Sequence, residues 1–139
     1  MSMRRFRRAY CYVYSLRTQF KRKGAAVSFE KSGPCFNFCR GFNCLTAKVD
    51  GVYKITYNTT SRAANSRNKA RYKVTVNGKT VPGSTYATFL DNDPLINYSG
   101  QVVVKLKRGD VVKLINVAGV TLTKNKKGDV TASLAINKL

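Results

Sequence analysis

The chain has 139 residues with 26 Lys plus Arg, 6 Asp plus Glu, a formal charge of +20, and neither His nor Trp. The absence of His excludes catalytic triads, metal sites and proton shuttles that depend on imidazole. The composition therefore favours a basic structural or binding protein of one domain over an enzyme, and neither a cofactor nor a small-molecule substrate is expected.

The first eight residues are predicted to form a flexible basic arm. No apolar segment with a cleavage site follows them, so a Sec-type signal peptide is not expected. No stretch approaches the roughly 18 apolar residues of a membrane span, so no membrane partner is expected. Basic residues clustered within a Debye length attract polyanions, either nucleic acid or an acidic polysaccharide, although a solubilising tail has the same composition. The candidate anion-binding residues are Arg4, Arg5, Arg7, Arg8, Lys21, Arg22 and Lys23.

Residues 9–139 are predicted to form one domain made of strands. Aromatic residues alternate with smaller ones over residues 10–16, which is the period of a strand. A second short strand is expected over residues 25–29, ended by Ser32-Gly33-Pro34. A third covers residues 52–58 and is entered through Asp50-Gly51, where the glycine is expected to supply a positive φ.

The second half of the domain continues this pattern. Apolar residues alternate over residues 71–76, and Asn77-Gly78 predicts a tight hairpin turn. Residues 101–106 and 111–117 flank a Gly-Asp turn at Gly109-Asp110 and are predicted to form another hairpin, and a last strand covers residues 131–138. Residues 61–70 lack an apolar stripe and are interpreted as a polar loop. The pattern indicates an all-β antiparallel sandwich or barrel.

The four cysteines allow three interpretations. Cys35, Cys39 and Cys44 follow a C-x₃-C-x₄-C spacing in a segment predicted to be loop-rich, and Cys11 lies far upstream. A zinc site normally has a paired knuckle at both ends, which this spacing does not provide. Disulfides or cross-links between subunits remain open, as do partly buried free thiols. A catalytic thiol would need a base that the chain lacks. Asp91-Asn92-Asp93 is interpreted as a polar turn rather than a calcium loop.

An ordered series of short motifs connects these elements. The motifs are Ala9-Tyr10-x-Tyr12-x-Tyr14, Val27-x-Phe29, Gly33-Pro34, Gly51-x-Tyr53-Lys54-Ile55, Val76-Asn77-Gly78-x-x-Val81-Pro82-Gly83-Ser84-x-Tyr86, Gly100-x-Val102, Leu106-x-x-Gly109-Asp110 and Ala132-Ser133-x-x-Ile136-x-Lys138-Leu139. In this order they resemble the C-terminal domain of the collagen-like exosporium glycoproteins of spore-forming bacteria, the BclA type. The resemblance covers roughly residues 9–139.

The resemblance implies an antiparallel β-sandwich with the TNF-like jelly-roll fold, about eight to ten strands, and a homotrimer. It also implies a non-enzymatic structural role at a bacterial spore or cell surface. Tyr10, Tyr12, Tyr14, Tyr53 and Ile136 would correspond to the apolar positions of the core and the three-fold axis. Two features differ from the family: the Arg-rich arm replaces a Gly-X-Y stalk, and the chain is strongly basic with four Cys. A nucleic-acid-binding or capsid-like jelly roll with a basic arm is the alternative hypothesis.

Overall fold

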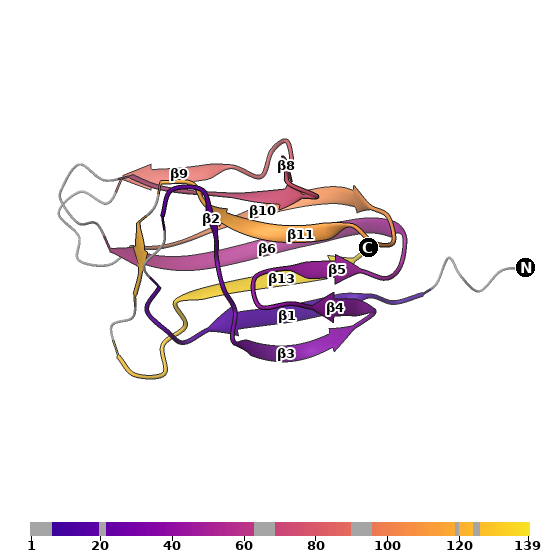
Figure 1. Cartoon of the computed structure of the whole chain (residues 1–139), viewed down its shortest axis with the longest axis horizontal. Coiled ribbons are helices and arrows are strands. Elements are labelled where there is room, and N and C mark those ends of the chain that lie inside the picture. Colours follow the sequence, from indigo (N-terminus) through magenta and orange to yellow (C-terminus); the bar gives the residue numbers. More distant parts are fainter. Residues whose placement is uncertain (1–6, 20–21, 63–68, 90–95, 119, 124–125) are drawn as a thin grey trace, which may run out of the picture.

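The structure is a computed structural model and describes residues 7–19, 22–62, 69–89, 96–118, 120–123 and 126–139. Within these ranges the chain forms thirteen strands (Figure 1). No helix there is long and apolar enough to cross a membrane. The strands are β1 Tyr10–Ser15, β2 Ala25–Ala26, β3 Lys31–Phe36, β4 Phe38–Arg40, β5 Leu45–Ala47, β6 Gly51–Arg62, β7 Lys69–Val76, β8 Lys79–Thr80, β9 Tyr86–Phe89, β10 Ile96–Leu106, β11 Val111–Asn116, β12 Thr121–Leu122 and β13 Ala132–Lys138.

The strands form two antiparallel sheets that pack face to face. Sheet A has the order β10-β6-β13-β1-β3, and β12 also pairs with β6. Sheet B has the order β4-β5-β11-β7-β8, with β2 on β11 and β9 on β7. The predicted all-β antiparallel sandwich with a jelly-roll fold is confirmed. The described strands outnumber the predicted eight to ten because β2, β8 and β12 are two-residue strands without a visible alternation.

The core lies between the sheets and is formed by every second residue along each strand, whose side chain points inward. In sheet A one inner row runs across the strands through Val13, Leu134, Tyr57 and Gly100. The ring of Tyr53 meets Phe38 edge-on at 5.5 Å between centroids. The largest fully buried side chains are Tyr53, Tyr57, Tyr72, Leu45, Ile55, Leu106, Leu114, Leu122, Leu134, Ile136 and Val13. Their burial supplies the main driving force for folding.

The two predicted hairpins have different outcomes. Asn77 and Gly78 adopt φ of 54° and 83° and pair Val76 with Lys79, so the first hairpin is confirmed. The second prediction is wrong, since β10 pairs with β6 in sheet A whereas β11 pairs with β5 and β7 in sheet B. The Gly109-Asp110 turn therefore connects the two sheets at a corner of the sandwich. Alternation does not reveal this, because strands of either sheet bury every second residue.

The segment from residue 25 to residue 44 also differs from the prediction. The expected strand over residues 25–29 is limited to β2, and β3 continues through Pro34 instead of ending before it. Proline is tolerated there because β3 is the edge strand of sheet A, and the register shifts between Cys11 and Val13 as in a β-bulge. The segment predicted to be loop-rich thus contains most of β3 and all of β4.

Gly51 does not have the predicted conformation. Its φ is not positive, whereas Gly109 has a φ of 93°. A Cβ on Gly51 would instead meet the side chain of Lys138 on β13. The predicted polar loop is shorter than expected, because β6 extends to Arg62 and β7 begins at Lys69. Residues 63–68 between them lie outside the described part of the chain.

Candidate interaction surfaces

The outer face of sheet A carries rows of uncharged side chains. The strand register aligns outward residues of β1, β13, β6 and β10 across the sheet. Two adjacent rows without a charge consist of Tyr12, Ala135, Thr56 and Gln101, and of Tyr14, Ser133, Asn58 and Ser99. These eight positions are uncharged although the chain has a formal charge of +20. Interface cores are depleted of charge and enriched in aromatic residues.

One edge of this face carries an aromatic cluster, here called the tyrosine patch: Tyr10, Tyr12, Tyr14 and Phe36. Tyr12 and Tyr14 stack with centroids 5.5 Å apart, and Tyr10 lies 6.0 Å from Phe36. Tyr10, Tyr12 and Phe36 are 39%, 36% and 52% exposed. Gly33 makes room for the patch, because a Cβ there would stand 2.9 Å from Cδ2 of Tyr12. The patch is an exposed aromatic surface on neighbouring strands of sheet A.

The opposite edge of the same face contains a groove of about 420 Å³ lined by residues of β6, the β8–β9 loop, β9 and β10. Val103 is 57% exposed there, and Tyr86 is 37% exposed. The Tyr86 hydroxyl donates to the carbonyl of Gln101 at 3.0 Å and so ties β9 of sheet B to β10 of sheet A. We call Tyr86, Gln101 and Val103 the β10 edge patch.

The structure separates the five residues proposed for the core and the three-fold axis. Tyr10, Tyr12 and Tyr14 point outward in the tyrosine patch, whereas Tyr53 and Ile136 are buried in the core at 0% and 1% exposure. Tyr53 donates to the carbonyl of Val49 at 2.6 Å. Of these five residues, only the three outward tyrosines are therefore accessible to another molecule.

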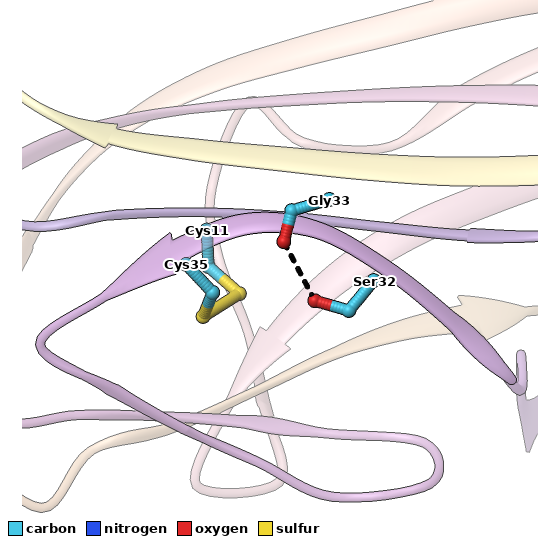
Figure 2. The surroundings of a disulfide bond; sticks show 4 residues. All are labelled: Cys11, Ser32, Gly33 and Cys35. Atoms are coloured by element: carbon cyan, nitrogen blue, oxygen red, sulfur yellow. Dashed lines mark hydrogen bonds between the residues drawn. A yellow bond between two sulfur atoms is a disulfide. The ribbon is translucent and has the colours of Figure 1, made fainter.

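The cysteines divide into one disulfide and two free thiols. Cys11 of β1 and Cys35 of β3 stand opposite each other and are bonded (Figure 2). The bond links the edge strand of sheet A to its neighbour. Cys39 is exposed and Cys44 is half-buried, and both are free. Since two of the four cysteines are bonded to each other, the four-cysteine zinc interpretation does not apply to this structure.

The candidate basic residues fall into two separate groups. Arg7 and Arg8 line a cavity of about 480 Å³ with Tyr10, Asn137 and Lys138, beside the start of β1. Arg22 and Lys23 are exposed beyond the other end of β1, in the turn before β2. The six residues of β1 span roughly 20 Å. Arg4, Arg5 and Lys21, like the Asp91-Asn92-Asp93 turn, lie outside the described residues.

Sequence reasoning missed a basic groove on the outer face of sheet B. The groove has a volume of about 280 Å³ and is lined by Gly24, Lys73, Thr75, Gly78, Lys113, Ile115 and Val117. We call it the lysine groove. Lys73 pairs with Ile115 and Lys113 with Thr75, so the two lysines are diagonal neighbours on β7 and β11. Alternation places each lysine on the outward side of its strand, but it does not show which strands become neighbours.

Each of the four described side-chain carboxylates accepts a hydrogen bond from a backbone N–H group. Glu30 accepts from Leu16, Asp50 from Arg108, Asp110 from Lys107 and Asp129 from Lys126, all within 2.8 Å. Burial acts to raise the pKa of Glu30, but hydrogen bonds from Ser15 and Leu16 and the nearby Arg17 together hold it below its ordinary value. None of these carboxylates lines the lysine groove.

The buried tyrosine hydroxyls serve as hydrogen-bond groups in the core. Tyr57 donates to the carbonyls of Tyr72 and Ser84 at 3.1 and 3.0 Å. The Tyr72 hydroxyl lies 2.7 Å from Oγ of Ser61. Burial raises the pKa of both tyrosines, that of Tyr72 to about 12. Both therefore remain neutral at ordinary pH and hold the sheets together.

The fold is shared with solved structures of low sequence identity. The globular domain of zebrafish complement 1qA protein is 17% identical, with coverage of 94% of this chain and 95% of that chain and a TM-score of 0.67. The TNF Eiger from S. frugiperda is 13% identical, with coverage of 95% and 92% and a TM-score of 0.75. Murine APRIL at pH 5.0 is 10% identical, with coverage of 96% and 100% and a TM-score of 0.69.

No protein-family model matches the chain, and no curated protein matches it significantly. The similarity to the solved structures extends over almost the whole of each chain, at identities that carry information on the fold alone. The chain therefore has the TNF-like jelly-roll fold of complement 1q and TNF proteins, and its function has to be argued from its own surfaces.

Proposed function

We propose that this protein is a non-enzymatic interaction module that assembles into a homotrimer through the outer face of sheet A. The observation that carries the proposal is the pair of uncharged rows on that face, bordered by the exposed tyrosine patch. A homotrimer is also the assembly that the resemblance to exosporium glycoproteins implies. An exposed aromatic surface of this kind is a mark of a protein–protein contact.

The two patches lie at opposite edges of the same face, which favours a ring over a two-fold dimer. A contact between the tyrosine patch of one copy and the β10 edge patch of the next uses two different surfaces. Such a heterologous contact closes into a ring when the rotation between copies allows it. The groove beside Tyr86 and Val103 offers space for an aromatic side chain of a neighbour.

The test is the molar mass in solution. Light scattering at micromolar concentration should give three times 15.5 kDa. Tyr12→Asp places a charge in the tyrosine patch, at the β1 end of an uncharged row, and should give a monomer that remains folded, because the side chain is on the surface. Phe42→Asp is the matched control, since Phe42 is 64% exposed but lies between β4 and β5 of sheet B. A monomeric native protein, or equal dissociation by both variants, would contradict the proposal.

The proposal of a non-enzymatic role is supported by residue chemistry. The chain contains no His, and the described carboxylates are held by backbone donors. The buried tyrosines have raised pKa values and internal partners, so they do not supply a base at neutral pH.

We further propose a location in the surface layer of a bacterial spore or cell. The ordered motifs of the sequence support this location, as does the Cys11–Cys35 disulfide, because disulfides persist in oxidising surroundings. A membrane-impermeant biotin reagent applied to intact spores and cells should label the protein. Labelling only after lysis would contradict a surface location without affecting the trimer.

A further inference from the structure

We propose that the lysine groove on the outer face of sheet B is a binding site for an acidic polysaccharide. The inference concerns the sheet that the proposed assembly does not use, and it does not rest on the trimer. Two half-buried lysines, Lys73 and Lys113, form its sides, with the hydroxyl of Thr75 and the apolar Ile115 between them.

The groove is positively charged. Lys73 and Lys113 are diagonal neighbours in the strand register, which places their Cβ atoms roughly 5–8 Å apart. No acidic residue is among the described residues that line the groove, so neither lysine has a carboxylate beside it in the lining. Two like charges at this spacing repel each other, and an anionic group between them removes the repulsion.

The basic surface extends beyond the groove. Gly24 lines the groove and follows directly after Arg22 and Lys23, which are exposed. Gly78 also lines the groove and is followed by the exposed Lys79. Neither glycine would place a Cβ within 4 Å of other atoms, so both leave open space. Basic residues thus continue from the groove along both glycine turns, as a polymer with repeated charges would require.

The lining of the groove favours one class of anionic polymer. Single-stranded nucleic acids bound without sequence preference are held in part by aromatic side chains on which their bases stack. The lining of the groove contains no aromatic residue. A polysaccharide that is recognised through its anionic groups, with its sugar rings over Ile115, fits this lining better than a single-stranded nucleic acid whose bases stack on aromatic side chains. We therefore infer a sulfated or carboxylated polysaccharide.

The test compares full-length variants for binding to heparin, used as a sulfated probe, at several salt concentrations. The double variant Lys73→Gln/Lys113→Gln should bind about tenfold more weakly and show a lower salt dependence. Lys126→Gln/Lys127→Gln is the matched control, because it removes two exposed charges from the connection between β12 and β13. It should change the affinity less than twofold. Molar mass and thermal unfolding are measured for each variant.

Two further measurements distinguish polysaccharide binding in the lysine groove from binding by residues 1–8 and from binding of nucleic acid. A deletion of residues 1–8 should retain the affinity for heparin within about threefold, since it leaves the groove intact. A poly-dT oligonucleotide of equal charge should bind more weakly than heparin. Unchanged heparin affinity in the groove variant, an equal loss in the control variant, a larger loss on deletion of the arm, or tighter binding of the oligonucleotide would each overturn the inference.

Discussion

The outer faces of sheets A and B differ although both are formed by alternating strands of one sandwich. In two of its rows the face of sheet A places small neutral residues between the tyrosine patch and the β10 edge patch, and the next row contains Lys54 beside Val103. The face of sheet B places Lys73 and Lys113 on neighbouring strands. Surface charge does not set the fold, so the two outer faces are free to differ in chemistry. This difference is the basis for proposing self-association through the face of sheet A and an anionic ligand on the face of sheet B.

The largest expected effect comes from placing the same charge on each face. Ala135→Lys introduces a positive charge in the uncharged rows of sheet A and should lower the molar mass threefold, from trimer to monomer. Thr46→Lys introduces the same charge at a half-buried outward position of β5 in sheet B and should leave the mass unchanged. Sedimentation of both variants decides the comparison. Dissociation by Thr46→Lys would show that the faces do not differ in this respect.

The edges of the two sheets provide a second comparison. The edge of sheet A is cross-linked by Cys11 and Cys35 across a sequence separation of 24, whereas β4 at the edge of sheet B carries the free thiol of Cys39. Removing the disulfide with Cys11→Ser/Cys35→Ser should lower the free energy of unfolding by about 3 kcal/mol.

The control for this prediction is Cys39→Ser/Cys44→Ser, which should change the stability by less than about 1 kcal/mol. Urea unfolding under non-reducing conditions measures both. Equal losses in the two double variants would mean that the cysteines contribute through packing alone.

Two glycines distinguish the core from the outer face of sheet A. Gly100 stands opposite Tyr57 in an inner row, and a Cβ there would overlap the rings of Tyr57 and Tyr86. Gly100→Ala should therefore lower the free energy of unfolding by about 3 kcal/mol. Gly33→Ala meets only the surface ring of Tyr12, which is free to turn away, and should cost about 1 kcal/mol. Thermal unfolding of both variants tests the ranking, and a smaller loss for Gly100→Ala would reverse it.

The buried tyrosines predict a loss of stability at alkaline pH. Burial raises the pKa of Tyr72 to about 12 in the folded protein, above the value of about 10 in the unfolded chain. Between these values the unfolded chain binds fewer protons, so stability falls as pH rises, by roughly 2 kcal/mol at pH 12. Urea unfolding between pH 9 and 12 should show this fall, and Tyr72→Phe should reduce it. An unchanged slope in the variant would assign the effect to other groups.

The sequence alone was sufficient to predict the fold class and several local elements. Period-two alternation identifies strands such as β1, β7 and β13 because a half-buried strand requires it. The turn at Asn77-Gly78 is equally local, since its positive φ values favour these two residue types. Pro34 was predicted to help end a strand, but it lies within β3. The cost of a proline in a strand depends on whether the strand lies at an edge, which the local sequence does not show.

The partners of each strand were decided only by the tertiary structure. Alternation specifies that every second residue is buried, but not which strand lies beside it, and for this reason the Gly109-Asp110 turn was assigned to a hairpin rather than to a corner between sheets. The choice of Cys35 as the partner of Cys11 and the meeting of Lys73 with Lys113 depend on the same non-local pairing. Local sequence determines strands through backbone geometry, whereas surfaces and cross-links arise from long-range packing of the whole core.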